Sequence, residues 1–299
     1  MDTHTELFQK HRPRLLGLAY RMLGTQADAE DVLHDAWLRW HAQDKARLDD
    51  AEAWLVTVTT RLALDRLRHA KVEREHYPGP WLPEPLIEAG ASPEAQAEQA
   101  QTLTISFLMM LERLSPEERA AFLLREVFDY THAEAAAILD ITEDACRQRT
   151  HRAKQRLREE RTRFTANAQT QRRLLERFAQ ALQQPTEENL RALFVEDAVH
   201  ISDGGGVVTA ALRPLLGSER IARLYLQVAK HEQGHQMRRD VRIVNGAPVL
   251  LTWADGQLVT ACWIECDGER IVALHALRNP QKLSRLAAVT HSPGGSSLH

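Results

Sequence analysis

The sequence predicts a multidomain protein in which two all-α helical domains, the second a helix-turn-helix, precede a C-terminal α+β domain with an antiparallel sheet. Three observations support this. Apolar residues recur at helical spacing through the first half of the chain. Alternation of apolar and polar residues, typical of strands, begins after residue 196. A proline-rich stretch, YPGPWLPEPL at 77–86, interrupts the helical half.

These patterns divide the 299 residues into five segments. The helical domains are expected at 1–75 and 102–165, with a linker at 76–101 between them. The α+β domain is expected at 166–286, and the tail at 287–299 is predicted to be disordered because it is rich in Ser and Gly. A chain of this length is expected to form at least two domains, each with its own core.

Composition excludes several classes of protein. The chain is 43% hydrophobic and 26% charged, as is usual for soluble globular proteins, and its formal net charge of -3 gives no overall sign of nucleic-acid binding. It lacks a long apolar run and an N-terminal signal core, so we expect a cytoplasmic protein without membrane contact. Cys146, Cys262 and Cys266 are expected to be reduced thiols in the cores.

The first helical domain contains two strongly patterned helices. The first is predicted to begin after Thr25, since Thr25 followed by Asp28 is a capping pattern. One face forms an apolar stripe, expected in a core: Val32, Leu33, Ala36, Trp37 and Trp40. The other face is mainly acidic: Asp28, Asp31, His34, Asp35 and Arg39. For the tryptophans Trp37, Trp40 and Trp54, core packing is favoured over stacking on bases.

The second helix is expected at about 52–75, and its far half is basic. Cations recur along it: Arg61, Arg66, Arg68, Lys71 and Arg74.

The second helical domain has sharp helix starts. Ser115-Pro116-Glu117-Glu118 combines an N-cap, a proline at the first helical position and a glutamate at the third. Thr131 and Glu134 repeat the capping box, and Thr142 is a further N-cap. A short alanine-rich helix, a tight turn and a basic helix then follow, which is typical of a helix-turn-helix.

The helix that begins at Glu143 is predicted to contact DNA. Its core face is expected to carry Cys146, Thr150, Ala153 and Leu157. The opposite face presents residues suited to base edges and phosphates: Asp144, Arg147, Gln148, His151, Arg152 and Arg156. The alternative is a solvated basic helix with no role in DNA binding.

The last part of the chain predicts helices at about 171–183, 186–194 and 217–230. Strand patterns occur in DAVHIS, MRRDVRIV, PVLLTWA, QLVTACWIEC and RIVALHAL, with the turn signals NGAP, ADGQ and CDGE between strands.

Four strings in order carry a family resemblance: DAEDVLHDAWLRW, EAWLVTVTTRLALDRLR, LSPEERAAFLLREVFDYTHAEAAAIL and RTHRAKQRLR. Across residues 5–163 the chain resembles extracytoplasmic-function (group 4) sigma factors, with sigma domains 2 and 4. The resemblance implies binding to core RNA polymerase, at its β′ clamp helices through Asp28, Asp31, His34 and Asp35, and also at its β flap. It also implies that the loop from Lys45 to Asp50 holds a flipped base of the −10 element.

Further roles follow from the same resemblance. Arg61, Asp65 and Arg68 would line the −10 single strand, although many members carry Asn where Arg61 stands. The helix from Glu143 would read the −35 duplex through five residues: Arg147, Gln148, His151, Arg152 and Arg156.

Residues 170–285 resemble the SnoaL-like fold, a cone-shaped α+β module. SDGGG at 202–206, NPQKL at 279–283 and WLPEPL at 81–86 resemble motifs of a sigma subgroup with a fused SnoaL-like domain. That subgroup usually has Lys at the place of Val207 and Asp at the place of Gln281. The resemblance implies an interdomain regulatory site formed by Trp81, Leu82, Pro83, Glu84, Pro85, Leu86, Asp203, Gly204, Gly205, Gly206, Asn279, Pro280, Lys282 and Leu283.

The same stretches allow a simpler interpretation. The three glycines at 204–206 are also compatible with a simple turn or bulge. Since Trp81, Leu82 and Leu86 gain nothing from exposure to water, we expect them to dock on the α+β domain near the glycine loop or the 279–283 segment.

The sequence therefore predicts a sigma factor that directs bacterial RNA polymerase to promoters and is regulated in cis by its C-terminal domain. It is not expected to be an enzyme, and neither a metal nor a cofactor is expected. Two alternatives stay open. One is a stand-alone helix-turn-helix regulator. The other is a SnoaL-like pocket enzyme or sensor with a small-molecule ligand, for which Asp203, His200 and His275 are candidates by residue type alone.

Overall fold

The computed structural model describes residues 3–43, 48, 50–86, 104–161 and 167–290. They belong to two compact units. The first unit combines Met1–His76 with Phe107–Glu160, and the second combines Tyr77–Ser106 with Arg161–His299. The described part of the linker, 77–86, therefore belongs to the same unit as the C-terminal domain. Within the described ranges, no helix is both long and apolar enough to cross a membrane.

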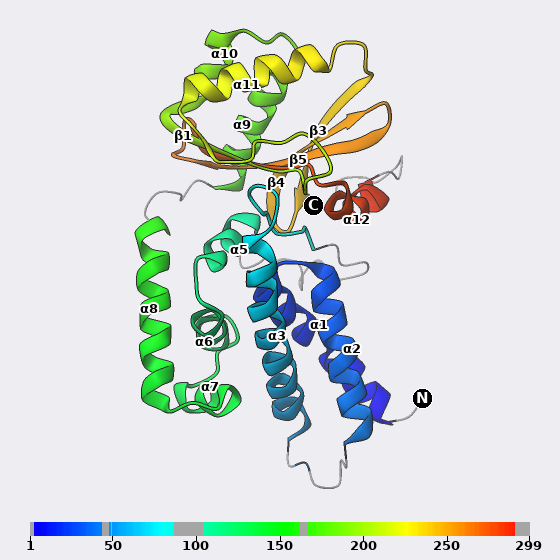
Figure 1. Cartoon of the computed structure of the whole chain (residues 1–299), viewed down its shortest axis with the longest axis vertical. Helices are drawn as coiled ribbons and strands as arrows, with labels where there is room; N and C mark the ends of the chain where they lie inside the picture. Colours follow the sequence, from blue (N-terminus) through cyan, green and yellow to red (C-terminus); the bar gives the residue numbers. More distant parts are fainter. Residues whose placement is uncertain (1–2, 44–47, 49, 87–103, 162–166, 291–299) are drawn as a thin grey trace. The chain divides into compact units, whose positions relative to one another are not determined.

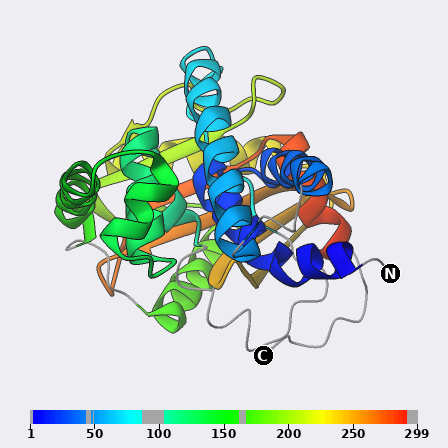
Figure 2. The same cartoon turned by 90° about the horizontal axis from the view of Figure 1, so that it is seen from below.

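The first unit begins with three helices that lie side by side (Figure 1): α1 (Thr3–Leu23), α2 (Gln26–Ala42) and α3 (Ala51–Glu75). Figure 2 shows the same three helices, in blue to cyan, from below. Thr25 caps α2 by accepting a hydrogen bond from the Asp28 amide at 3.2 Å, as predicted. Trp40 is buried and contacts Trp54, with ring centroids 5.7 Å apart, so core packing is confirmed for this pair.

The described residues of this unit form four further helices: α5 (Ile105–Glu112), α6 (Pro116–Glu126), α7 (His132–Leu139) and α8 (Glu143–Arg161). The capping boxes predicted at Ser115 and Thr131 are both present. Asp140 adopts a left-handed conformation, with φ of 56°, which ends α7 and makes the tight turn before α8. The predicted helix-turn-helix is confirmed.

The second unit has four helices and a six-stranded sheet within its described residues. The helices are α9 (Ala168–Ala181), α10 (Glu187–Arg191), α11 (Ser218–His231) and α12 (Pro280–Thr290). The strands are β1 (Phe194–Asp203), β2 (Leu215–Leu216), β3 (Met237–Val244), β4 (Ala247–Ala254), β5 (Gln257–Cys266) and β6 (Ile271–Leu277). Their order in the sheet is β2-β1-β6-β5-β4-β3.

The sheet is mixed, which differs from the antiparallel sheet predicted. Four pairings are antiparallel, but β1 pairs with β6 in parallel, with Ile201 opposite His275 and Asp203 opposite Leu277. Alternation places residues on faces of a strand and carries no information about which distant strand will be its neighbour. The C-terminal boundary also shifts, since α12 continues four residues beyond 286. The rest of the predicted tail, 291–299, lies outside the described residues.

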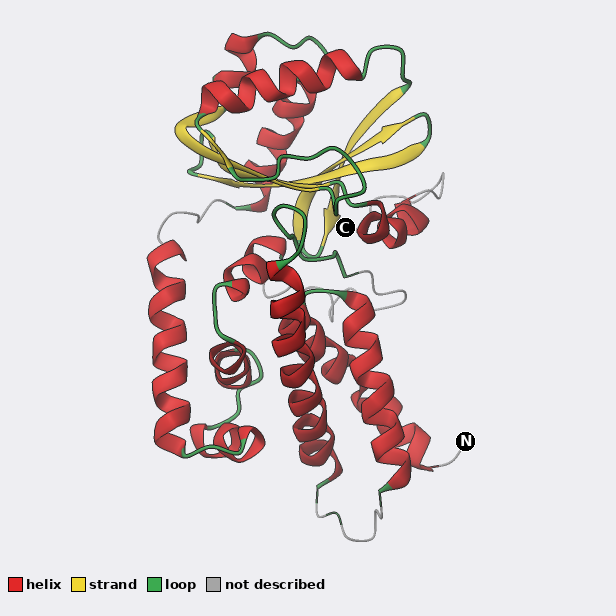
Figure 3. Ribbon diagram, in the orientation of Figure 1, coloured by secondary structure: helices red, strands yellow, loops and turns green. Residues whose placement is uncertain are grey.

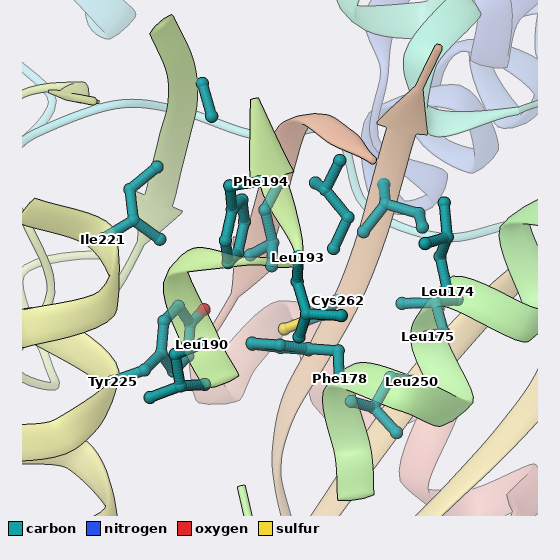
Figure 4. Packing of buried hydrophobic residues seen from close by; sticks show 14 of the residues in the cluster. Leu174, Leu175, Phe178, Leu190, Leu193, Phe194, Ile221, Tyr225, Leu250 and Cys262 are labelled. Carbon is teal, nitrogen blue, oxygen red and sulfur yellow. The ribbon is translucent and has the colours of Figure 1, made fainter. Parts of the chain in front are cut away.

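The core of the second unit lies between the sheet and the helices α9 and α11, while α12 contacts β5 (Figure 3). Phe178 is one of the buried side chains of this core (Figure 4). The Phe178 ring makes edge-to-face contacts with Phe194 at 6.0 Å and with Tyr225 at 4.8 Å. Such pairs add stability beyond the burial of their area. The interior of the curved sheet is thus filled by large side chains.

Candidate nucleic-acid interface and linker site

The acidic face of α2 lies on the surface of the first unit. Asp31, His34 and Asp35 are exposed, in agreement with the predicted stripe pattern. Asp28 differs from them, because its carboxylate pairs with the Arg66 guanidinium at 2.8 Å and is largely covered. Beside this face is a hollow of 310 Å³, lined by Phe8, Gln9, Arg12, Glu30, Leu33, His34 and Trp37. Three of the four predicted polymerase contacts are therefore available to a partner.

Helix α8 presents two distinct faces. Its core face is buried as predicted: Cys146, Thr150, Ala153 and Leu157. Its other face is exposed: Asp144, Arg147, Gln148, His151, Arg152 and Arg156. Arg147 pairs with Glu143 one turn earlier, which leaves most of its guanidinium in solvent.

The buried Glu118 binds arginines in the middle of α8, a contact that the sequence did not predict. Glu118 completes the capping box of α6 and also accepts a hydrogen bond from Arg156 at 2.6 Å. Arg152 lies 3.9 Å from the same carboxylate. The capping box was visible in the sequence, but the second partner on α8 was not.

The residues predicted to line the −10 strand lie on α3. Arg68 pairs with Asp65 at 2.9 Å and donates two hydrogen bonds to Glu117 on α6, at 3.0 and 3.1 Å. Arg61 donates to the carbonyl oxygen of Ile138 at 3.0 Å. Lys45 lies outside the described residues.

In the second unit, Asp203 at the end of β1 is the centre of a buried polar cluster. Its side chain is fully excluded from solvent. The carboxylate accepts hydrogen bonds from the Tyr77 hydroxyl at 2.6 Å, the Leu82 amide at 2.9 Å and the Gly205 amide at 3.0 Å. It also pairs with the Lys282 ammonium at 2.7 Å. A buried carboxylate needs partners of this kind because an uncompensated charge in a core is very costly.

Lys282 binds the linker at several points. Its ammonium donates to the Leu82 carbonyl oxygen at 2.6 Å and lies 4.3 Å from the centre of the Trp81 ring, a cation–π contact. Asn279 donates to the Tyr77 hydroxyl at 3.0 Å. Arg285 on α12 lies 4.0 Å from Glu84. The structure therefore brings the WLPEPL and NPQKL segments together around Asp203.

The glycine loop, 204–206, also lies close to the linker and to Asn279. Gly205 and Gly206 both have positive φ, of 64° and 71°. A Cβ atom on Gly205 would lie 2.3 Å from the Asn279 amide, and one on Gly206 would lie 2.6 Å from the Pro78 ring. The loop is thus a turn, and its glycines also permit close approach of two other segments.

The other predicted members of this site lie around the same cluster. Pro83, Glu84, Pro85, Leu86, Gly204 and Leu283 are buried, whereas Pro280 is exposed at the start of α12.

The two residues that depart from the subgroup pattern, Val207 and Gln281, do not disrupt the polar cluster around Asp203. Val207 is 62% exposed and Gln281 is exposed as well, so neither contributes to the cluster. Sequence reasoning missed Tyr77, whose pKa is raised by burial and by its hydrogen bond to Asp203. A tyrosine at the start of an apolar, proline-rich linker was the available signal, because a buried hydroxyl needs a partner.

The three candidates for catalysis do not converge. His275 lies opposite Ile201 in the sheet, on the face that carries Asp203, and it lies 3.2 Å from a carboxylate oxygen of Glu265. His200 is on the other face, against the Tyr225 ring, and burial followed by the proximity of His275 lowers its pKa to about 4. Asp203 is occupied by the linker. These residues form no shared acid–base site.

An open hollow of 620 Å³ lies elsewhere on the second unit, lined by Glu187, Glu188, Arg191, Ala192, Phe194, Glu196, Ser218 and Arg270. A small-molecule ligand of the C-terminal domain, which the sequence left open as an alternative, is not tested by this hollow.

Comparison with known proteins agrees with this geometry. Residues 7–72 match the family model for sigma-70 region 2, and residues 104–157 match that for sigma-70 region 4. These ranges contain α2, most of α3 and most of the helix-turn-helix.

Full-length relatives extend the match across the second unit. The chain is 32% identical over 306 residues to the ECF RNA polymerase sigma factor SigJ of Mycobacterium tuberculosis, covering 98% of this chain and 97% of the relative. It is 27% identical over 290 residues to the probable ECF sigma factor SigI of the same species, covering 96% and 97%. The crystal structure of SigJ matches with a TM-score of 0.72 and 29% identity, over 97% of this chain and 99% of that one.

Both helical regions and the C-terminal domain thus have counterparts in one kind of protein. The alternatives of a stand-alone regulator and of a pocket enzyme are not favoured by these relatives. The chain belongs to the extracytoplasmic-function sigma factors, which direct RNA polymerase to specific promoters, in the subgroup with a C-terminal SnoaL-like domain.

Proposed function

We propose that this sigma factor is regulated in cis by its C-terminal domain, which holds the linker between regions 2 and 4. The observation that carries the proposal is the buried cluster in which Asp203 and Lys282 bind both the amide and the carbonyl of Leu82. Backbone groups of the linker are thereby fixed by side chains of another domain. The proline residues stiffen the segment further, because they restrict φ.

The tether makes this docking an intramolecular equilibrium. The linker and the cluster belong to one chain, so their effective concentration is high and even a moderate interaction can be well populated. A linker held on the C-terminal domain is restricted in how far it allows regions 2 and 4 to separate. The C-terminal domain would in this way control the fraction of sigma factor molecules that can bind a promoter.

The partners of the helical unit are part of the same proposal. The exposed face of α2, with Asp31, His34 and Asp35, binds the clamp helices of the polymerase β′ subunit. Region 4 binds the β flap, and the exposed face of α8 reads the −35 duplex. Arg147 and Gln148 lie near the N-terminal end of that helix, the part that enters the major groove in helix-turn-helix proteins. These activities place the protein in the cytoplasm.

Transcription in vitro from a promoter library tests the regulatory proposal. Lys282→Met removes the ammonium that binds Leu82, and a chain truncated after Arg163 removes the whole domain. Both are expected to change the yield of promoter-directed transcripts in the same direction. Lys230→Met, at an exposed position on α11, is the matched control and should behave as the wild type. Transcription by both variants that equals the wild type would exclude regulation in cis.

Binding to core polymerase tests the partner assignment separately. Asp31→Lys together with Asp35→Lys reverses two exposed charges on α2 without touching the buried stripe, and capture of core polymerase should fall. A chain that binds duplex DNA as a dimer but captures no core polymerase would contradict the proposal and favour a stand-alone regulator.

A further inference from the structure

Four cations of α3 lie on one face of the helix and form a cationic stripe, which we define as Arg61, Arg68, Lys71 and Arg74. Their spacing of seven, three and three residues keeps them on one side of a helix of 3.6 residues per turn. Arg66 lies outside the stripe and pairs with Asp28 and Glu73. The stripe includes both arginines that the family resemblance places along the −10 strand.

The first member of the stripe binds the end of α7. The Arg61 guanidinium donates to the carbonyl oxygens of Ile138 at 3.0 Å and Ala137 at 3.4 Å. These carbonyls belong to the last turn of α7, where a helix carries partial negative charge, and the Ala137 oxygen also accepts a hydrogen bond from the Asp140 amide. Region 4 therefore offers Arg61 a site that favours a cation.

The second member binds the start of α6. The Arg68 Nε and Nη2 atoms both donate to one carboxylate oxygen of Glu117, at 3.1 and 3.0 Å. Glu117 lies in the first turn of α6, and this ion pair is partly open to solvent, with the Arg68 side chain 50% exposed.

The last two members bind the segment that precedes α6. The Lys71 ammonium donates to the Leu114 carbonyl oxygen, and Arg74 pairs with Glu112, which also binds the buried Arg119. Burial would raise the pKa of Glu112, but the charges of Arg119 and Arg74 keep it low, so this glutamate is ionised. All four cations are thus bound to oxygen acceptors of region 4.

Carbonyl and carboxylate oxygens are acceptors of the same kind as the phosphate oxygens of a nucleic acid. We infer that the cationic stripe has two mutually exclusive partners: region 4 in the free protein and the phosphate backbone of single-stranded DNA at a promoter. Region 4 would occupy the stripe until the strand displaces it. The inference rests on the proposed function, because the strand is the ligand expected for region 2 of a sigma factor.

The exchange is expected to begin at Arg61 and Arg68. The Arg68 ion pair is exposed, and exposed ion pairs contribute little to stability. The Arg61 contacts are hydrogen bonds to carbonyl oxygens near the surface, one part-buried and one exposed. The pair of Arg74 with Glu112 is more buried, so it should separate later.

Glu117→Gln in the full-length chain tests the inference, because it removes the carboxylate that binds Arg68 and leaves the stripe unchanged. The measurement is the fluorescence anisotropy of a short labelled single-stranded DNA of random sequence. The Kd is expected to fall by about two- to fivefold, the equivalent of one exposed ion pair. Glu219→Gln is the matched control, since Glu219 also lies in a first helical turn and pairs with an arginine.

A second variant, Arg68→Gln, shows whether a tighter Kd comes from the release of Arg68 or only from the loss of a negative charge. Without Arg68, the gain from Glu117→Gln should disappear, because no side chain is freed. An unchanged Kd for Glu117→Gln, a gain that persists with Arg68→Gln, or absence of strand binding by all variants would overturn the inference. Capture of core polymerase by the wild type is measured alongside. If capture succeeds while the Kd is unchanged, the inference fails and the proposed function stands.

Discussion

The Asp203 carboxylate and the Lys282 ammonium lie 2.7 Å apart, and both also bind the backbone of Leu82. The pair is nearly excluded from solvent, with side-chain exposures of 0% and 10%. In such a place each charge depends on the other, because the loss of one leaves the other unpaired in a medium of low polarity. The linker is held by the same two groups, so its docking and the stability of the pair are linked.

Asp203→Asn should release the linker from the C-terminal domain. The substitution leaves the Lys282 ammonium without its counter-charge, a change that typically costs about 3–5 kcal/mol in buried pairs. Hydrogen exchange of the Leu82 amide, measured by mass spectrometry of peptides from 77–86, should become faster. Asp197→Asn, at an exposed position of the same strand, should leave exchange unchanged.

Adding Lys282→Met to Asp203→Asn should recover part of the lost stability, since no buried charge then remains. If the double variant is less stable than Asp203→Asn alone, the ammonium has other partners that matter more than this pair.

Gly206→Ala should destabilise linker docking more than Gly256→Ala destabilises its own turn. Both glycines have positive φ, so both substitutions carry the backbone strain of that region. A Cβ at 206 meets the Pro78 ring at 2.6 Å, whereas a Cβ at 256 meets nothing within 4 Å. The difference between the two losses in unfolding free energy, expected to be about 1–3 kcal/mol, isolates the contact with the linker. Equal losses would show that the loop needs glycine for its turn alone.

Arg147→Ala should weaken binding to one base position of the −35 element by roughly 1–3 kcal/mol if Arg147 reads that base. Binding to a set of −35 duplexes, each with one changed position, is the measurement. A uniform loss across the set would instead assign Arg147 to a phosphate. Arg172→Ala is the control, because Arg172 on α9 also pairs with a glutamate one turn away.

The C-terminal domain should lose stability as the pH falls from 6.5 towards 4. His200 is buried and neutral, and its pKa of about 4 in the folded protein is below the value of 6.5 expected when unfolded. Protons therefore bind the unfolded chain first, at a cost to folding of roughly 3 kcal/mol over this interval. The free energy of unfolding is measured by urea titration at each pH, with hydrogen exchange of residues 194–203 as the probe of unfolding. His200→Gln should flatten the pH dependence, and His231→Gln, at an exposed position, should not.

Local features of this fold could be predicted from the sequence because they depend on neighbouring residues. The caps at Thr25, Ser115 and Thr131 are examples, since the side chain and the amide that it binds lie three residues apart. The buried stripe of α8 follows from helical spacing in the same way.

Long-range partners could not be predicted by such reasoning. The parallel pairing of β1 with β6, the contact of Arg61 with Ile138 and the contact of Tyr77 with Asp203 each join residues that are far apart in the chain. Their side-chain types are compatible with many neighbours, and only the tertiary structure selects one. For the linker site, the motif resemblance indicated the two segments, while the ion pair at which they meet depends on the tertiary structure.

The contact between Lys282 and Leu82 has a consequence for the order of events during synthesis. The two residues are 200 positions apart. At ribosomal rates of about 5–20 residues per second, the lysine is made roughly 10–40 s after the leucine. Region 2 precedes the linker and region 4 ends at residue 157, so both regions are complete, and the linker still has no anchor, while residues 158–281 are made. A product terminated before Lys282 would therefore keep an unanchored linker, so docking of the linker marks chains whose synthesis has passed Lys282.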